Sequence, residues 1–153
     1  MRCRWRELLV ASVALPSPGA AQQVREIGIQ AVATASDPAL AVAGVYGGLR
    51  TSGRTRVSVS LGAGISGSEM AGRGELLGHF LLSPEERRRA GVYFAGGIAV
   101  VEGAVSRGYL VLTLGVEERP RSSPGWALEL GIGGGARIGL GYRWRWFSGI
   151  QSQ

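Results

Sequence analysis

His79 is the only histidine in the chain, so general acid–base chemistry near neutral pH would have to pass through it. Glu75 lies four residues before it and Ser83 four residues after it, a spacing that puts all three on one face of a strand. Four extended residues span about 13 Å, however, whereas proton transfer needs contacts of about 3 Å. A neighbouring strand would have to supply the partners. We therefore predict no catalytic residue, and interpret His79 as hydrogen-bonded to a carboxylate inside the fold.

Residues 62–67 match the Gly-x-Gly-x-x-Gly pattern of dinucleotide-binding loops. Such a site also needs a helix that begins directly after the loop, because the helix N-terminus binds the pyrophosphate. Gly72 and Gly74 interrupt the region where this helix would form. In a chain with 26 glycines the match is close to accidental, and we expect no cofactor.

Metal and nucleic-acid sites are not predicted either. Cys3 is the only cysteine and lies at the very start of the chain, so a disulfide or a thiolate metal site is not expected. All 17 basic residues are arginines and the net charge is +6, but they are spread along the sequence instead of clustering on one face. The one consecutive run, residues 87–89, is interpreted as a solvated polar turn.

The elements that must position these residues are strands, and the last of them, residues 137–146, shows this best. Ile138, Leu140, Tyr142, Trp144 and Trp146 alternate with arginines and glycines. Successive side chains of a strand point to opposite sides, so this segment has one apolar face and one charged or side-chain-free face. A helix over the same residues would scatter both kinds around its axis.

Seven earlier segments show the same period of two, separated by turn signals. The eight predicted strands cover residues 24–35, 39–50, 54–65, 75–82, 91–101, 106–117, 125–133 and 137–146. The facing of residues 39–50 stays open, because both of its faces are apolar. No helix-length segment separates any pair, which favours an all-β fold: a closed antiparallel up-and-down barrel of about eight strands.

The composition of the second strand face, opposite the large apolar residues, indicates which face points out of the barrel. It consists mainly of glycine, alanine and serine with a few charges of both signs. Small residues with compensating charges suit a narrow interior and would make a poor aqueous coat. We therefore predict that the apolar face points outward, to lipid, and that an interior charge network forms from Arg56, Glu75, Glu129, Arg143 and Arg145. Arg143 and Arg145 are expected to pair with Glu75 and Glu129.

Aromatic residues give an independent indication. In an up-and-down barrel, even-numbered strands end where odd-numbered strands begin. This parity brings five outward aromatics to one rim: Phe80, Phe94, Trp126, Trp144 and Trp146. Such a girdle is typical of a membrane interface, where aromatic rings prefer the headgroup level.

The N-terminus has the order of a secretory signal peptide. Three arginines among residues 2–6 precede an apolar run over residues 8–15, and small residues lie just before Gln22. The apolar run is too short to span a bilayer as a helix, which takes about 20 residues. We predict a cleaved signal over residues 1–21 and a barrel domain over residues 22–153.

The last strand also carries a resemblance. Residues 137–144 read Arg-Ile-Gly-Leu-Gly-Tyr-Arg-Trp, which looks like the polar-x-Gly-x-x-aromatic-x-aromatic assembly signal of bacterial outer-membrane barrels; the matching positions are Arg137, Gly139, Tyr142 and Trp144. With the strand count and the export signal, the chain resembles the small eight-stranded OmpA/OmpX-type class. The resemblance implies an outer-membrane location, contact with outer-membrane lipid, and insertion by the barrel-assembly machinery.

The expected function is thus that of a monomeric integral outer-membrane barrel with a structural or surface role and no catalysis. The alternative is a soluble periplasmic barrel that binds an apolar ligand inside, as lipocalins do. These two differ in the direction of Leu110, Leu112 and Leu114. Less favoured are a lipid-modifying outer-membrane enzyme acting through His79 and a narrow pore lined by the interior charges.

Overall fold

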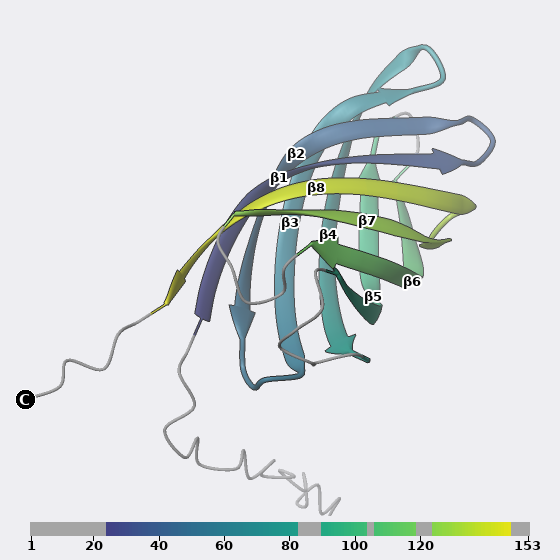
Figure 1. Cartoon of the computed structure of the whole chain (residues 1–153). Helices are drawn as coiled ribbons and strands as arrows, with labels where there is room; N and C mark the ends of the chain where they lie inside the picture. Colours follow the sequence, from purple (N-terminus) through teal and green to yellow (C-terminus); the bar gives the residue numbers. More distant parts are fainter. Residues whose placement is uncertain (1–23, 83–89, 104–105, 119–123, 148–153) are drawn as a thin grey trace, which may run out of the picture.

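Eight antiparallel strands close into a barrel in the computed structural model, which describes residues 24–82, 90–103, 106–118 and 124–147 (Figure 1). They are β1 (Val24–Ala35), β2 (Leu40–Arg50), β3 (Thr55–Ser66), β4 (Glu69–Leu81), β5 (Ala90–Glu102), β6 (Arg107–Glu118), β7 (Gly125–Ile132) and β8 (Ala136–Phe147). Each strand pairs with its neighbour in sequence, and β1 also pairs with β8. The predicted fold class is confirmed, and closure gives each of the described strands a paired neighbour on both sides.

The barrel has two distinct ends. The first residues of β1 and the last of β8 lie side by side, with Val24 opposite Phe147, at what we call the terminal end. At the other, which we call the hairpin end, β1 leads to β2, β3 to β4, β5 to β6 and β7 to β8, each over a few residues. Figure 1 shows the β3–β4 hairpin at the top of the view and the β1–β2 hairpin at its right. Among the described residues, no helix is long and apolar enough to cross a membrane.

One predicted boundary was wrong, at the start of the fourth strand. β4 begins at Glu69 and follows a turn of only Gly67 and Ser68, whereas the predicted fourth strand began at residue 75. Gly67 has a φ of +62°, a conformation that glycine adopts without strain. The outward positions 72 and 74 are glycines, so the first half of β4 lacks the apolar alternation that reveals a strand.

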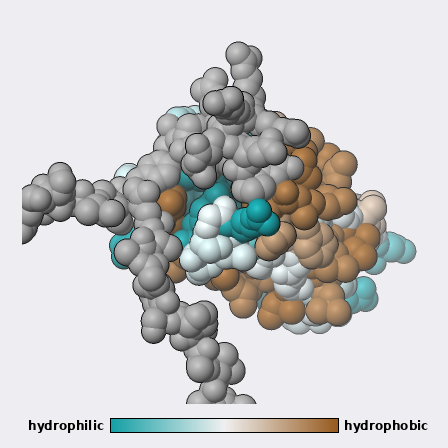
Figure 2. Space-filling model, turned by 60° about the horizontal axis from the view of Figure 1, so that its bottom comes forward, coloured by the Kyte–Doolittle hydropathy of each residue, from teal (hydrophilic) through white to brown (hydrophobic). Residues whose placement is uncertain are grey.

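The outer wall of the barrel is apolar. Twenty-eight large hydrophobic side chains are exposed on the described residues, from Ile27 near the start of β1 to Trp146 near the end of β8. Figure 2, which brings the bottom of Figure 1 forward, shows hydrophobic residues over much of the outer surface and hydrophilic residues gathered within the rim. The prediction that the apolar face points outward is confirmed. The facing of β2 is also settled, because Leu40 and Val42 point inward.

The interior is polar and tightly filled, and apolar groups form only small clusters within it. Arg143 and Val111 are fully buried, and Tyr93 is only 1% exposed. The Tyr93 ring occupies the space beside Gly115, its cross-strand partner on β6, where a Cβ atom would overlap the ring. The interior glycines thus make room for long side chains that cross the lumen.

Candidate functional site

The largest polar assembly inside the barrel lies toward the terminal end and is centred on Glu117 of β6. We call it the Glu117 cluster, and its members are Glu26, Arg50, Arg56, Glu117, Arg143 and Arg145. Glu117 Oε2 lies 2.5 Å from Arg143 Nη1 and 3.2 Å from Arg145 Nη2. Its Oε1 lies 3.3 Å from Arg50 Nη2. One carboxylate therefore contacts guanidinium groups from β2, β3 and β8.

Glu26 supplies the second carboxylate of this cluster. Its Oε1 lies 2.9 Å from Arg56 Nη1, and its Oε2 accepts a hydrogen bond of 2.9 Å from Arg145 Nε. Both glutamates are less than 5% exposed. Charges this deeply buried must be paired and hydrogen-bonded to be tolerated. The two carboxylates thus tie together β1, β2, β3, β6 and β8.

A second network, which we call the Glu75 cluster, lies nearer the middle of the barrel and consists of Arg73, Glu75, Glu129 and Arg137. Arg73 Nε lies 2.6 Å from Glu75 Oε1, and Arg137 Nη2 lies 2.9 Å from Glu75 Oε2. Arg137 Nη1 also contacts Glu129, whose other oxygen accepts a hydrogen bond of 2.7 Å from Tyr93 Oη. This cluster contains two acidic and two basic residues.

All five charges predicted for the interior do lie there, but the predicted pairing was wrong. Arg143 and Arg145 contact Glu117 and Glu26, whereas Glu75 and Glu129 contact Arg73 and Arg137. The reason is register: Glu26 is the direct cross-strand partner of Arg145 once β1 closes on β8. Alternation in a sequence assigns a side chain to a face, but only the register gives its level along the barrel.

The predicted network lacked five members of these clusters, namely Glu26, Arg50, Arg73, Glu117 and Arg137, the last of which was predicted as part of the assembly signal. Two carried a usable signal. Glu26 alternates with Ile27 and Ile29 in β1, and Glu117 shares its parity with Val111 and Thr113 in β6. Each is a charge on the face opposite the large apolar residues, which is the criterion that selected Glu129.

His79 is held by residues of the neighbouring strand, and its partners are not the carboxylate that was expected. Its Nδ1 lies 2.8 Å from Arg56 Nη2, and its Nε2 lies 2.7 Å from Ser58 Oγ. Arginine can only donate, so Nδ1 is the acceptor and the neutral ring carries its proton on Nε2. That proton is donated to Ser58. The nitrogen next to the hydroxyl therefore cannot act as its base, and the Ser58–His79 pair is not arranged for nucleophilic catalysis.

The interior around these networks is nearly full. Cavities of only about 30 and 10 Å³ lie beside His79 and Tyr93. A cavity needs about 10–15 Å³ of such space to hold one water molecule, so these two have room for only a few at most. Among the described residues the side chains of the Glu117 cluster cross the lumen at this level, which gives the pore hypothesis no support.

The four assembly-signal positions of the last strand lie on both faces of β8. Arg137 is buried in the Glu75 cluster, and Gly139 lies beside the Glu129 side chain. Tyr142 and Trp144 lie on the outer side, where their rings meet edge to face at 5.0 Å between centroids. In the closed barrel both edges of β8 are paired, with β7 and with β1.

The five predicted rim aromatics all lie on the outer wall, each at least 40% exposed. They occur near the terminal end: Phe80 is the cross-strand partner of Phe94, and Trp126 is that of Tyr142. The Trp126 and Tyr142 rings are 4.7 Å apart in an edge-to-face arrangement. Up-and-down topology thus brings aromatics from four strands to one rim.

The structure also bears on the remaining motifs of the sequence. Residues 62–67 run from β3 into the two-residue turn, and β4 follows in place of a helix, so the dinucleotide-loop pattern has no structural basis. Within the described residues no group of three or more His, Cys, Asp and Glu side chains could hold a metal ion. The predicted signal peptide and the arginine run at residues 87–89 lie outside the described residues.

The Glu75 cluster gives a first prediction. Glu129→Ala removes the partner of both Arg137 Nη1 and Tyr93 Oη. Because its carboxylate is partly exposed, we expect a smaller loss than for a fully buried ion pair, of about 1–3 kcal/mol in the free energy of unfolding. The measurement is the urea midpoint of the refolded barrel. Glu69→Gln, at the exposed start of β4, is the control, and an unchanged midpoint for Glu129→Ala would contradict the pairing.

Comparison with known proteins finds the fold but no sequence family. No protein-family model matches the chain, and no curated protein matches it. Among solved structures, the N-terminal β-barrel domain of Pseudomonas aeruginosa OprF aligns with a TM-score of 0.65 at 12% identity, covering 82% of this chain and 98% of that one. Ail, the attachment invasion locus protein of Yersinia pestis, aligns at 0.54 and 14% identity, covering 82% and 99%. Both are small eight-stranded outer-membrane barrels, so the expected resemblance is confirmed at the level of fold.

Proposed function

We propose that the chain is an integral outer-membrane β-barrel with a structural or surface role and no catalytic activity. The observation that carries the proposal is its reversed polarity: large hydrophobic side chains cover the outside, and arginines and glutamates fill the inside. A protein surrounded by water would have to expose this apolar wall, which is far larger than the apolar patches that soluble monomers tolerate.

The dimensions of the wall support the same conclusion. Seven strands have 11 to 13 residues, and β7 has 8. A tilted strand needs about 9–11 residues to cross the hydrocarbon core of a bilayer. Closure satisfies backbone hydrogen bonds between strands, as a lipid environment demands. The aromatic rim at the terminal end would then lie at one membrane interface.

The lipocalin-like alternative required the apolar face to line the interior. Its discriminating residues point the other way: Leu110, Leu112 and Leu114 are 77%, 47% and 57% exposed. The inward residues of the same strand include Thr113 and Glu117, which belong to the filled polar interior. An apolar ligand of lipocalin size therefore has no room at this level of the barrel.

Assembly follows from the proposed location. The partners we propose are outer-membrane lipid along the wall and the barrel-assembly machinery during insertion, with the last strand as the recognised element. Before closure, β8 would present the free edge that later pairs with β1, together with Tyr142 and Trp144 on its outer side. A signal peptide over residues 1–21 would direct export, and we propose that the barrel functions as a monomer.

Gel mobility tests the proposal directly. Outer membranes from expressing cells are washed with urea, and the retained protein is run in SDS with and without heating. We expect retention in the membrane fraction and a heat-dependent shift in mobility, because a closed barrel stays folded in SDS until heated. Protein released by the wash without any shift would overturn the membrane assignment.

A further inference from the structure

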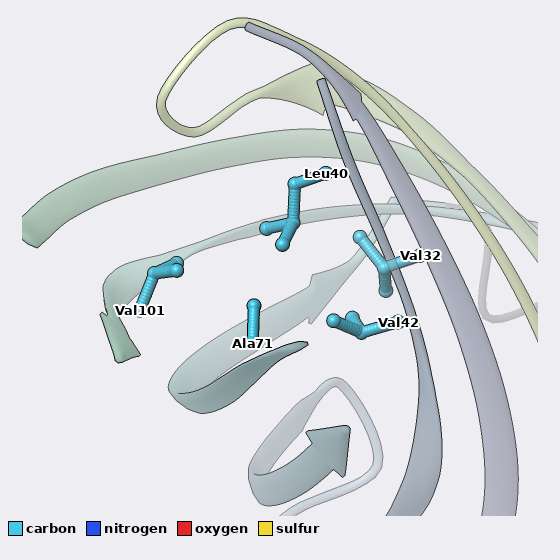
Figure 3. Packing of buried hydrophobic residues seen from close by; sticks show 5 residues of the cluster. All are labelled: Val32, Leu40, Val42, Ala71 and Val101. Carbon is cyan, nitrogen blue, oxygen red and sulfur yellow. The ribbon is translucent and has the colours of Figure 1, made fainter. Parts of the chain in front are cut away.

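Positive charge inside the barrel is concentrated toward the terminal end. The Glu75 cluster, with two acidic and two basic residues, is neutral. Toward the hairpin end the interior holds an apolar cluster, whose members point toward one another (Figure 3): Val32, Leu40, Val42, Ala71 and Val101. The Glu117 cluster, by contrast, has four arginines and two glutamates, an excess of two positive charges. Within the described part of the barrel, the imbalance of the lumen lies in this cluster.

Two of these arginines are direct neighbours. Arg50 is the cross-strand partner of Arg56 at the end of the β2–β3 ladder, and like charges in that position repel each other. The carboxylate of Glu117 bridges them across the lumen, at 3.3 Å from Arg50 Nη2 and 3.4 Å from Arg56 Nη1. The same carboxylate also contacts Arg143 and Arg145, so its single negative charge is divided among four guanidinium groups. The repulsion between the two neighbours is therefore only partly offset.

Arg54 brings a third guanidinium group to this place. It is exposed in the β2–β3 turn, and its side chain contacts no carboxylate in the part of the chain that the structure describes. With Arg50 and Arg56 it lines a recess of about 10 Å³, in which Glu117 is the only acidic lining residue. That volume is about the least that holds one water molecule. The side chain of Arg50 is 13% exposed, so the recess can be reached from solution.

We propose that this recess binds one small inorganic anion of the size of chloride, held between the guanidinium groups of Arg50 and Arg54 with Arg56 in its wall. Buried charge is tolerated when it is paired, and the anion would supply negative charge where the lumen lacks it. Arg56 is held in place for this role, since it donates to His79 Nδ1 and lies 5.2 Å from the centre of the Tyr93 ring. The site belongs to the lumen and does not depend on the lipid outside.

The test uses the full barrel in lipid nanodiscs at constant ionic strength, with gluconate replaced stepwise by chloride and amide NMR as the readout. We expect saturable shifts at Arg50, Gly53 and Arg56, and none at Gly134 near the hairpin end. Bromide should reproduce these shifts, whereas sulfate is too large for the recess and should not. Absence of a saturable chloride shift, equal shifts at Gly134, or tighter binding of sulfate would each overturn the proposal.

A neutral substitution at the mouth tests the contact directly. Arg54→Gln should weaken chloride binding roughly tenfold, because hydrogen bonds to charged groups are stronger than neutral ones. Arg107→Gln is the matched control, since Arg107 is an exposed arginine near the hairpin end. Variants are compared only after their heat-dependent gel shift shows a folded barrel. Unchanged affinity in Arg54→Gln, or an equal loss in Arg107→Gln, would contradict the site.

A substitution that supplies its own carboxylate gives the complementary test. The urea midpoint of the original barrel should rise as chloride replaces gluconate, as for any ligand that binds the folded state alone. Arg54→Glu puts a negative charge at the recess, so it should abolish chloride binding and make the midpoint independent of chloride. A chloride dependence that persists in Arg54→Glu would overturn the proposal, while an intact gel shift leaves the membrane assignment standing.

Discussion

Glu117→Gln is expected to lower the free energy of unfolding by about 3–5 kcal/mol, the cost of leaving buried charges without their partner. Glu117 contacts Arg50, Arg56, Arg143 and Arg145, and each of these contacts has a nitrogen–oxygen distance of 3.4 Å or less. After the substitution, Glu26 is the only carboxylate of the described cluster that remains. The measurement is the urea midpoint of the barrel refolded in lipid vesicles.

A second substitution separates lost pairing from general damage. Arg143 is fully buried, and its side chain contacts Glu117 and the Glu118 carbonyl. Arg143→Gln in the Glu117→Gln background removes one of the uncompensated cations, so it should recover part of the lost stability instead of adding to the loss. Two outcomes would contradict the role of Glu117. One is a double variant in which the two losses of stability add; the other is a free energy of unfolding for Glu117→Gln within about 0.5 kcal/mol of that of the original protein.

The faces of the barrel could be predicted from the sequence, because a strand has a period of two and a closed barrel has only an inside and an outside. Trp144 and Leu112 needed no knowledge of register to be placed on the wall. The aromatic rim could also be predicted from the sequence, since up-and-down topology brings Phe80 and Phe94 to the same end of the barrel. What failed were predictions that depend on the level of a residue along the axis.

Glu117 shows why that level could not be predicted. Its parity puts it inside, but its contact with Arg50 joins two residues 67 positions apart from strands that are not paired with each other. Such contacts cross the lumen, and they depend on strand tilt and on the stagger of the closed barrel. Arg73 was missed for a different reason, because it belongs to the half of β4 that showed no strand pattern.

A charge on the outer wall is expected to cause the other large loss of stability, and Leu112→Arg tests this expectation. Leu112 lies midway along β6, points outward, and has Gly96 and Ile132 as cross-strand partners. If lipid surrounds the wall, arginine at this level should cost about 2–4 kcal/mol, because it must leave water to enter the hydrocarbon. The measurement is the fraction of protein that shows the folded band after refolding into vesicles at increasing urea.

Depth dependence makes this prediction specific to a membrane. Met70→Arg is the matched control: Met70 is 82% exposed on the same outer surface, but it lies beside the β3–β4 turn at the hairpin end. There the cost should fall to about 0–1 kcal/mol, because the side chain can reach the headgroups. In water the two substitutions would be equally harmless, since both side chains would be solvated. Equal tolerance at the two positions would therefore argue against lipid around the barrel, whereas a loss confined to Leu112→Arg would place the middle of β6 within the hydrocarbon core.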